Sequence, residues 1–250
     1  MVESIDPHYK KNIMSNIKIN YHQLVGPDVD SPFSLDGVGF EPELMLNNVS
    51  KESVYWRCPA WKHKASRTFI LRSPVDLTLT VDLENKTLNS PNVTQWQFDK
   101  YCNPTFLNNW CSEEKVTIQL TIPRFMFWTN HKNVWIESRP HFSTPIRNNL
   151  TAIPGWYNLS SWTRPLGAAF DVIDPSKPII INRGDPLLEV CFYSKNLNDG
   201  IILKKSYPSK NVKDKMDKIS LIKEYVRGVS NTLMFKEQKS KCPFDFMWKK

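Results

Sequence analysis

The sequence predicts a mainly β protein, a sandwich or barrel of the jelly-roll or cupin-like kind that ends in an amphipathic helix. Three observations support this class. In short runs, apolar residues alternate with polar residues at a period of two. Pro, Gly, Asn and Asp separate these runs, and a helical period occurs only near the C-terminus. We therefore expect a β body over residues 1–202, including an irregular segment 1–50 packed on it, and a basic helical tail over 203–250.

The strands are clearest in the middle of the chain. The run RTFILRSPVDLTLTVDL predicts two strands broken at Ser73-Pro74, and the ENKT that follows is typical of a turn. Further strands are expected in the runs KVTIQLTIPRFMFW, NVWIESRPHF, GAAFDVI, PIIINR and PLLEVCFY. Strands this short, separated by turn residues, indicate a sandwich or barrel.

An Arg-Gly-Asp tripeptide lies in the segment INRGDPLL and raises the question of cell adhesion. Asn182 and Gly184 tolerate positive φ, and Asp185-Pro186 suits a turn or the start of a strand. The N-terminal residues contain no apolar stretch typical of a secretory signal. We therefore interpret the tripeptide as a hairpin bend between residues 179–181 and 187–190.

The positive charge is concentrated in the tail. Residues 203–250 carry thirteen Lys and Arg against five Asp and Glu, which accounts for the whole net charge of +8. An apolar stripe at helical spacing runs through Met216, Ile219, Ile222, Val226, Val229 and Leu233. A basic face flanks it, made of Lys213, Lys215, Lys218, Lys223 and Arg227. We favour a helix docked on the body or on a partner subunit, with nucleic acid or an acidic membrane surface as the alternatives.

Motifs for common chemistries are absent from the sequence. None of the five histidines is followed two residues later by His, Asp or Glu, the spacing typical of oxygenase and cupin metal sites. No GxGxxG, GxxxxGK[ST], GxSxG or HExxH occurs, and the five cysteines lack the spacing of zinc ligands. No apolar run reaches the ~20 residues of a membrane span. We expect no cofactor, although His131 and His141 remain an alternative metal pair if folding brings them to an acidic residue.

Tryptophans supply the candidate binding residues. Trp56 and Trp61 flank RCPA, while Trp156 and Trp162 flank YNLSS just before Arg164. Flat aromatic faces bind rings and anchor interfaces, and an arginine beside them adds an anion or stacking contact. The alternative is that these tryptophans fill the core, as most do in a β-sandwich.

The segments WYNLSSWTRPLGAAFDVIDPSKPIIINRGDPLLEVCFY, YWRCPAW and RTFILRSPVDLTLTVD together resemble a family of uncharacterised proteins from marine tailed phages, cyanophages in particular. The resemblance spans roughly residues 54–193. It implies a phage-encoded protein in the host cytoplasm or the virion, and it transfers no activity and no catalytic residue. The final turn is also similar to the corresponding turn of cupins, which is an analogy of fold alone.

These observations lead us to expect a non-enzymatic binding or structural protein that acts through protein–protein contacts, by self-association or with a protein partner. Nucleic-acid binding through the basic tail is a further expectation. The alternative is a cupin-like, metal-dependent enzyme of the oxygenase type whose ligands come together from distant positions.

Overall fold

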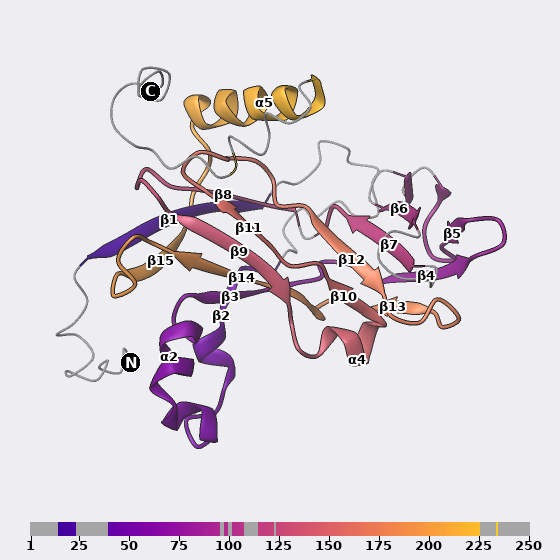
Figure 1. Ribbon diagram of the computed structural model, residues 1–250, viewed down its shortest axis with the longest axis horizontal. Helices are drawn as coiled ribbons and strands as arrows, with labels where there is room; N and C mark the ends of the chain where they lie inside the picture. The colour runs from indigo at the N-terminus through magenta and orange to yellow at the C-terminus, as the bar shows by residue number, and fades with distance from the viewer. Residues whose placement is uncertain are drawn as a thin grey trace, which may run out of the picture.

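The computed structural model describes residues 15–23, 40–95, 98–99, 102–107, 115–122, 124–225 and 234. Within these residues strand is the main regular structure, arranged in several sheets around one apolar core, so the predicted mainly β fold is confirmed (Figure 1). None of the helices in this part of the chain has the length and hydrophobicity needed to cross a membrane.

The largest sheet has five antiparallel strands in the order β11-β9-β14-β3-β2. Their bounds are β11 Gly155–Asn158, β9 Trp135–Pro140, β14 Pro186–Tyr193, β3 Thr68–Arg72 and β2 Glu43–Leu44. Strand β14 is central, and seven of its eight residues are buried, so both faces of the sheet are covered there. Strand β11 is the edge strand opposite the short β2.

Three smaller sheets complete the body. The first has the order β15-β1-β8, with β15 Gly200–Lys205, β1 Asn16–Gln23 and β8 Phe125–Trp128. The second has the order β10-β12-β7-β6, with β10 Leu150–Ala152, β12 Ala168–Val172, β7 Lys115–Leu120 and β6 Cys102–Leu107. The third has the order β13-β4-β5, with β13 Ile179–Ile181, β4 Leu77–Asp82 and β5 Thr87–Asn89.

Aromatic rings join the sheets in the core. The rings of Phe127 on β8 and Phe192 on β14 lie 5.4 Å apart at an angle of 64°, and Phe69 on β3 lies 5.9 Å from Phe192. These edge-to-face contacts are the favoured geometry of aromatic pairs. They connect the three-stranded sheet of β1 and β8 to the five-stranded sheet through one continuous apolar layer.

The N-terminal segment is more regular than we expected. Strand β1 lies inside residues 1–50, where we predicted irregular structure, and it pairs in parallel with β15 and antiparallel with β8. Strand β15 also runs across the predicted boundary after residue 202. The signal was present in the sequence NIKINYHQ, where buried Ile17, Ile19 and Tyr21 alternate with polar residues.

Short helices occur well before the tail, which corrects the expectation that helical structure begins only after the β body. Three of them form a lobe below β2 and β3 in Figure 1: η1 Met45–Asn48, η2 Val54–Arg57 and α2 Pro59–Ala65. A fourth, α4 Thr144–Asn148, follows β9. Both α2 and α4 have Pro in their first turn, where a missing N–H costs nothing.

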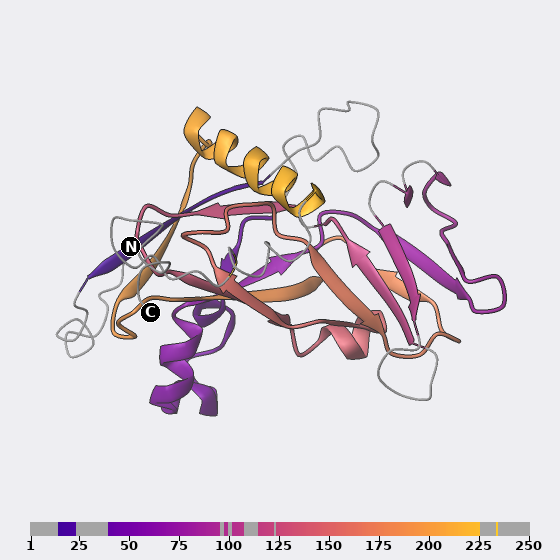
Figure 2. The ribbon, with the colours of Figure 1, turned by 45° about the horizontal axis from the view of Figure 1, so that its top comes forward.

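The tail helix α5, Lys210–Tyr225, lies over the sheet that contains β1 and β8 (Figures 1 and 2). Ile219 is 5% exposed, and Met216 and Ile222 of the predicted stripe are partly buried. The Nζ of Lys215 donates a hydrogen bond of 2.8 Å to the carbonyl of Ser160 in the body. The stripe residues Val226, Val229 and Leu233 lie outside the described residues.

The Arg-Gly-Asp tripeptide is a bend, but it does not close a hairpin. Strand β13 before it pairs with β4, whereas β14 after it pairs with β3 and β9, so the turn passes the chain from one sheet to another. Gly184 has a φ of 90°, which favours glycine. Local turn residues predicted the bend correctly, but strand pairing is a long-range choice that they do not encode.

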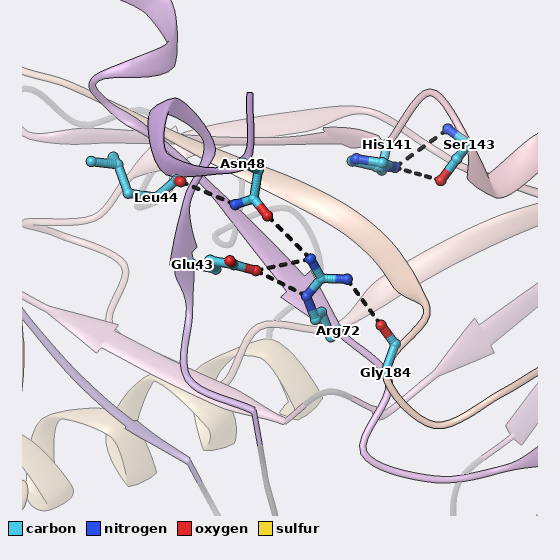
Figure 3. Close-up of polar contacts among 7 residues, drawn as sticks. All are labelled: Glu43, Leu44, Asn48, Arg72, His141, Ser143 and Gly184. Atoms are coloured by element: carbon cyan, nitrogen blue, oxygen red, sulfur yellow. Dashed lines mark hydrogen bonds and ion pairs between the residues drawn. The ribbon is translucent and has the colours of Figure 1, made fainter. Parts of the chain in front are cut away.

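Two side chains fix this turn through hydrogen bonds. Asp185 Oδ2 accepts hydrogen bonds from Asn148 Nδ2 at 2.8 Å and from the Asn182 backbone N–H at 2.9 Å. Arg72 donates to the Gly184 carbonyl at 3.0 Å and pairs with Glu43 at 2.8 Å, as Figure 3 shows. The Asp carboxylate of the tripeptide is therefore engaged in structure, which argues against an adhesion role.

We predict that Asp185→Ala destabilises the protein by about 1–3 kcal/mol, because the buried Asn148 amide and the Asn182 N–H lose their shared acceptor. Asp185→Asn retains one acceptor oxygen and should fall between Asp185→Ala and the wild type. Urea denaturation measures both changes. Asp217→Ala, at an exposed position of α5, is the control, and an equal effect there would contradict this role of Asp185.

Candidate functional site

A pocket of about 420 Å³ lies beside the edge strand β11. Its walls come from β11, from β7 and β12 of the four-stranded sheet, and from the loop that follows residue 158, so it sits where two sheets meet. Gly155 and Gly167 line it without a side chain. The side chains most able to contact a ligand are Gln119, Ser138, Trp156, Tyr157, Trp162 and Arg164.

The loop that carries Arg164 is held at both ends. After β11, the Asn158 carbonyl accepts the N–H of Trp162 at 2.9 Å, and Asn158 Oδ1 accepts the N–H of Ser160 at 2.9 Å. At the far end, the N–H of Leu166 donates to the Phe125 carbonyl at 2.7 Å. Because the backbone is fixed on both sides, Arg164 has a defined place in the pocket wall.

Arg164 is a partly buried cation, and no carboxylate among the described residues pairs with it. Its Nε is inaccessible to water and makes no hydrogen bond. The guanidinium lies 5.9 Å from the ring of Trp162, which is 2% exposed and forms the floor beneath it. Burial lowers the pKa of Arg164, although the Tyr157 phenol opposes this shift. A buried charge without a partner is costly, so this arrangement favours an anion in the pocket.

Tyr157 places a second donor beside the cation. Burial raises the pKa of its phenol well above the ordinary value, while the charge of Arg164 acts in the opposite direction. The phenol therefore keeps its proton at neutral pH and acts as a hydrogen-bond donor. Together, Arg164 and Tyr157 can stabilise negative charge on a ligand oxygen.

Trp156 provides an accessible aromatic surface at the mouth of the pocket. The side chain is 59% exposed, and its ring lies 5.0 Å from that of Trp135 on the neighbouring strand β9. A tryptophan side chain this exposed usually contacts another molecule, and a flat ring of a ligand can stack on its face. The structure thus brings Trp156, Trp162 and Arg164 to one place, with Trp162 as a core residue and Trp156 as a surface.

The other tryptophan pair lies elsewhere. Trp56 and Trp61 belong to the helical lobe next to β2 and β3, at the opposite side of the five-stranded sheet from β11. Trp56 donates from Nε1 to the Val49 carbonyl at 2.8 Å, and Trp61 packs on the ring of Tyr55 at 5.6 Å. These contacts hold the lobe together, so the two predicted pairs do not form one site.

The alternative metal pair is contradicted by geometry. His131 precedes β9 and His141 follows it, so a strand of six residues, about 20 Å in length, separates them. His141 Nδ1 lies 2.8 Å from the Ser143 hydroxyl and accepts the Ser143 N–H (Figure 3). In the described part of the chain, no three His, Cys, Asp or Glu side chains lie close enough to share a metal ion.

Only part of the basic face lies within the described residues. Lys213, Lys215 and Lys218 are exposed on α5, and Lys215 reaches the body. The side chain of Lys223 and the whole of Arg227 lie outside the described residues. The nucleic-acid expectation therefore stays a prediction.

Sequence reasoning missed three of the six side chains most able to contact a ligand: Gln119, Ser138 and Tyr157. Gln119 is far from β11 along the chain, and only the meeting of two sheets brings it near. Tyr157 stands between the two tryptophans in the sequence, but strand alternation predicts that it faces away from Trp156. At an edge strand, however, both faces border the same pocket.

No protein-family model matches the chain, and no curated protein matches it in sequence. Among solved structures, a dUTPase of Staphylococcus bacteriophage 80alpha with dUpNHpp is 6% identical, with a TM-score of 0.36 over 77% of this chain and 88% of that chain. Native EIAV dUTPase is 10% identical, with a TM-score of 0.34 over 77% and 98%. The dUTPase from phage phi11 of S. aureus is 9% identical, with a TM-score of 0.36 over 77% and 96%.

These neighbours correct one expectation. We expected a non-enzymatic protein that acts through protein–protein contacts, whereas the three solved structures named above are those of dUTPases. The likeness is distant and transfers no residue, ligand or activity to this chain. The resemblance to marine phage proteins stays a prediction, since no comparison bears on it.

We predict a pH-dependent stability that originates at His141. Burial, followed by the charges of Arg72 and Arg147, lowers the pKa of this imidazole from 6.5 to about 4. Below pH 6.5 the unfolded chain gains a proton that the folded chain does not take up, so stability falls as the pH drops towards 4, by about 3 kcal/mol in total.

Urea denaturation across this pH range tests the assignment. His141→Asn should abolish most of the pH dependence, whatever its effect on stability at neutral pH. His131→Asn, at an exposed turn, is the matched control and should keep the wild-type slope. An unchanged slope in His141→Asn would show that another group is responsible.

We also predict that Arg164→Met leaves the ligand-free protein as stable as the wild type or more stable, by up to about 1–2 kcal/mol. The substitution removes a desolvated charge and keeps the aliphatic packing on Trp162. Thermal and urea denaturation measure the change. A clear loss of stability would mean that Arg164 has a structural partner.

Proposed function

We propose that the chain binds a small anionic molecule containing a flat ring, in the pocket beside β11. The observation that carries this proposal is the guanidinium of Arg164, partly buried in the pocket wall with an Nε that has no hydrogen-bond partner. A volume of about 420 Å³ lies within the range typical of small-molecule sites.

Each wall of the pocket would have a distinct role. Arg164 would hold the anionic group, and Tyr157 would donate a hydrogen bond to one of its oxygens. Trp156 would stack on the ring of the ligand, while Gln119 and Ser138 offer polar contacts at the rim. The same donors would stabilise negative charge that develops during a reaction, so the pocket suits a substrate as well as a ligand that is only bound.

Fluorescence titration of the tryptophans tests the proposal with paired probes. Benzoate is compared with benzamide, and uridine 5′-monophosphate with uridine, so that each pair differs in its negative charge. We expect an anionic member to bind and its neutral partner to bind much more weakly. Arg164→Gln should weaken the anion roughly 10- to 100-fold, as the loss of a charge-assisted hydrogen bond predicts.

Arg183→Gln is the matched control, because Arg183 also lies over an aromatic ring, 5.6 Å from Phe40, but outside this pocket. It should leave the affinity unchanged. Equal binding of charged and neutral probes, or an undiminished affinity in Arg164→Gln, would refute the proposal.

Self-association remains a second prediction about partners. Phe142, just before α4, is 75% exposed, and Ile146, within α4, is 87% exposed. Large apolar side chains this exposed and close in sequence are typical of contact surfaces.

A further inference from the structure

A second pocket, of about 350 Å³, lies on the outer face of the five-stranded sheet. It is lined by Trp135 and Glu137 of β9, Trp156 of β11 and Tyr193 of β14. In the antiparallel register, Trp135 stands opposite Tyr193 and Trp156 opposite Glu137, and directly opposed residues project from the same face. Three adjacent strands thus place three aromatic rings around one carboxylate.

The walls of this pocket are held in place by contacts among themselves. The rings of Trp135 and Trp156 lie 5.0 Å apart at an angle of 32°. The Tyr193 hydroxyl donates a hydrogen bond of 2.6 Å to Glu137 Oε2. This bond orients the carboxylate and uses one of its two oxygens. The pocket is therefore preorganised and does not depend on a ligand for its shape.

The carboxylate of Glu137 has no cationic partner within the described chain. Arg139, two residues further along β9, is occupied by Glu189, whose Oε2 lies 2.7 Å from both Nε and Nη2 of the arginine. Tyr193 contributes a neutral hydrogen bond and no charge. A negative group thus stands among aromatic rings, and the ring faces are negative as well.

We infer that this pocket is an aromatic cage that binds a small organic cation of the quaternary ammonium type. Tryptophan faces attract cations most strongly among aromatic side chains, and recognition of such cations by several rings is a well-established use of the interaction. Glu137 supplies the opposite charge from the side of the cage. The cage has a different charge preference from the Arg164 pocket and does not rest on the function proposed for it.

The donor and acceptor balance selects a quaternary cation over the alternatives. A primary ammonium has three N–H groups to satisfy, whereas the cage offers little beyond the second oxygen of Glu137. A divalent metal ion requires several oxygen ligands, and the cage has a single carboxylate. A neutral apolar ligand would leave Glu137 desolvated and unpaired. A trimethylammonium group needs no hydrogen bond and can rest against the aromatic surfaces that line the pocket.

Choline and its uncharged carbon isostere, in which a tert-butyl group replaces trimethylammonium, provide the test. Tryptophan fluorescence or ligand-detected NMR should show saturable binding of choline and much weaker binding of the isostere. Glu137→Gln retains the hydrogen bond from Tyr193 and removes the charge, and Trp156→Leu removes one ring. Each should weaken choline binding roughly 5- to 30-fold.

Glu41→Gln is the matched control, since Glu41 is an exposed carboxylate paired with Lys205 away from the cage, and it should have no effect. Arg164→Gln should also leave choline binding unchanged, which separates the cage from the anion pocket. Equal binding of choline and its isostere, or full affinity in Glu137→Gln, would overturn the inference.

Vesicles of phosphatidylcholine distinguish two sources of the same headgroup. Binding of free choline without vesicle binding assigns a soluble ligand, and vesicle binding that free choline displaces assigns a lipid headgroup. Both results support the cage. Vesicle binding that choline does not displace would contradict it.

Discussion

The burial of β14 on both faces is the constraint on which the rest of the structure depends. Leu188, Val190 and Phe192 point into the apolar core, while Glu189 and Cys191, which alternate with them, point the other way and are also buried. Both faces of the central sheet must therefore be covered, by the smaller sheets on one side and by other segments of the chain on the other. The buried carboxylate of Glu189 is tolerated because Arg139 pairs with it on the neighbouring strand.

Covering the centre of the sheet leaves the edge at β11 open, and two charged side chains lie in pockets near it. Glu189 has a partner within the fold, whereas Arg164 and Glu137 have no ion-pair partner among the described residues. Both lie in pockets to which the exposed ring of Trp156 contributes. Charged side chains held near the rim of a rigid sheet are well placed to bind ligands. The charged residue is Arg164 in one pocket and Glu137 in the other, so the two pockets favour ligands of opposite charge.

Arg72 shows how one side chain organises distant segments. From β3 it contacts Glu43 of β2, Asn48 of η1 and the Gly184 carbonyl (Figure 3). It thereby joins the helical lobe to the turn that leads into β14. The tripeptide in that turn has the composition of an adhesion motif, but its carboxylate is used to hold Asn148 and the backbone. A motif defined by three residues carries no information about such distant partners.

The sequence by itself determined the mainly β class, the strands around Ser73-Pro74, the bend at residues 182–185 and the grouping of Trp156, Trp162 and Arg164, because period-two alternation and turn residues are local properties. It also contained the alternation of buried and polar residues in β1. Only the tertiary structure decided that β13 and β14 belong to different sheets and that His131 and His141 lie at opposite ends of β9. It also decided that Gln119 lines one pocket with Trp156 and that Tyr193 lines the other with the same tryptophan. Strand pairing depends on contacts between residues far apart in the sequence. The pockets between sheets form only after the strands have paired.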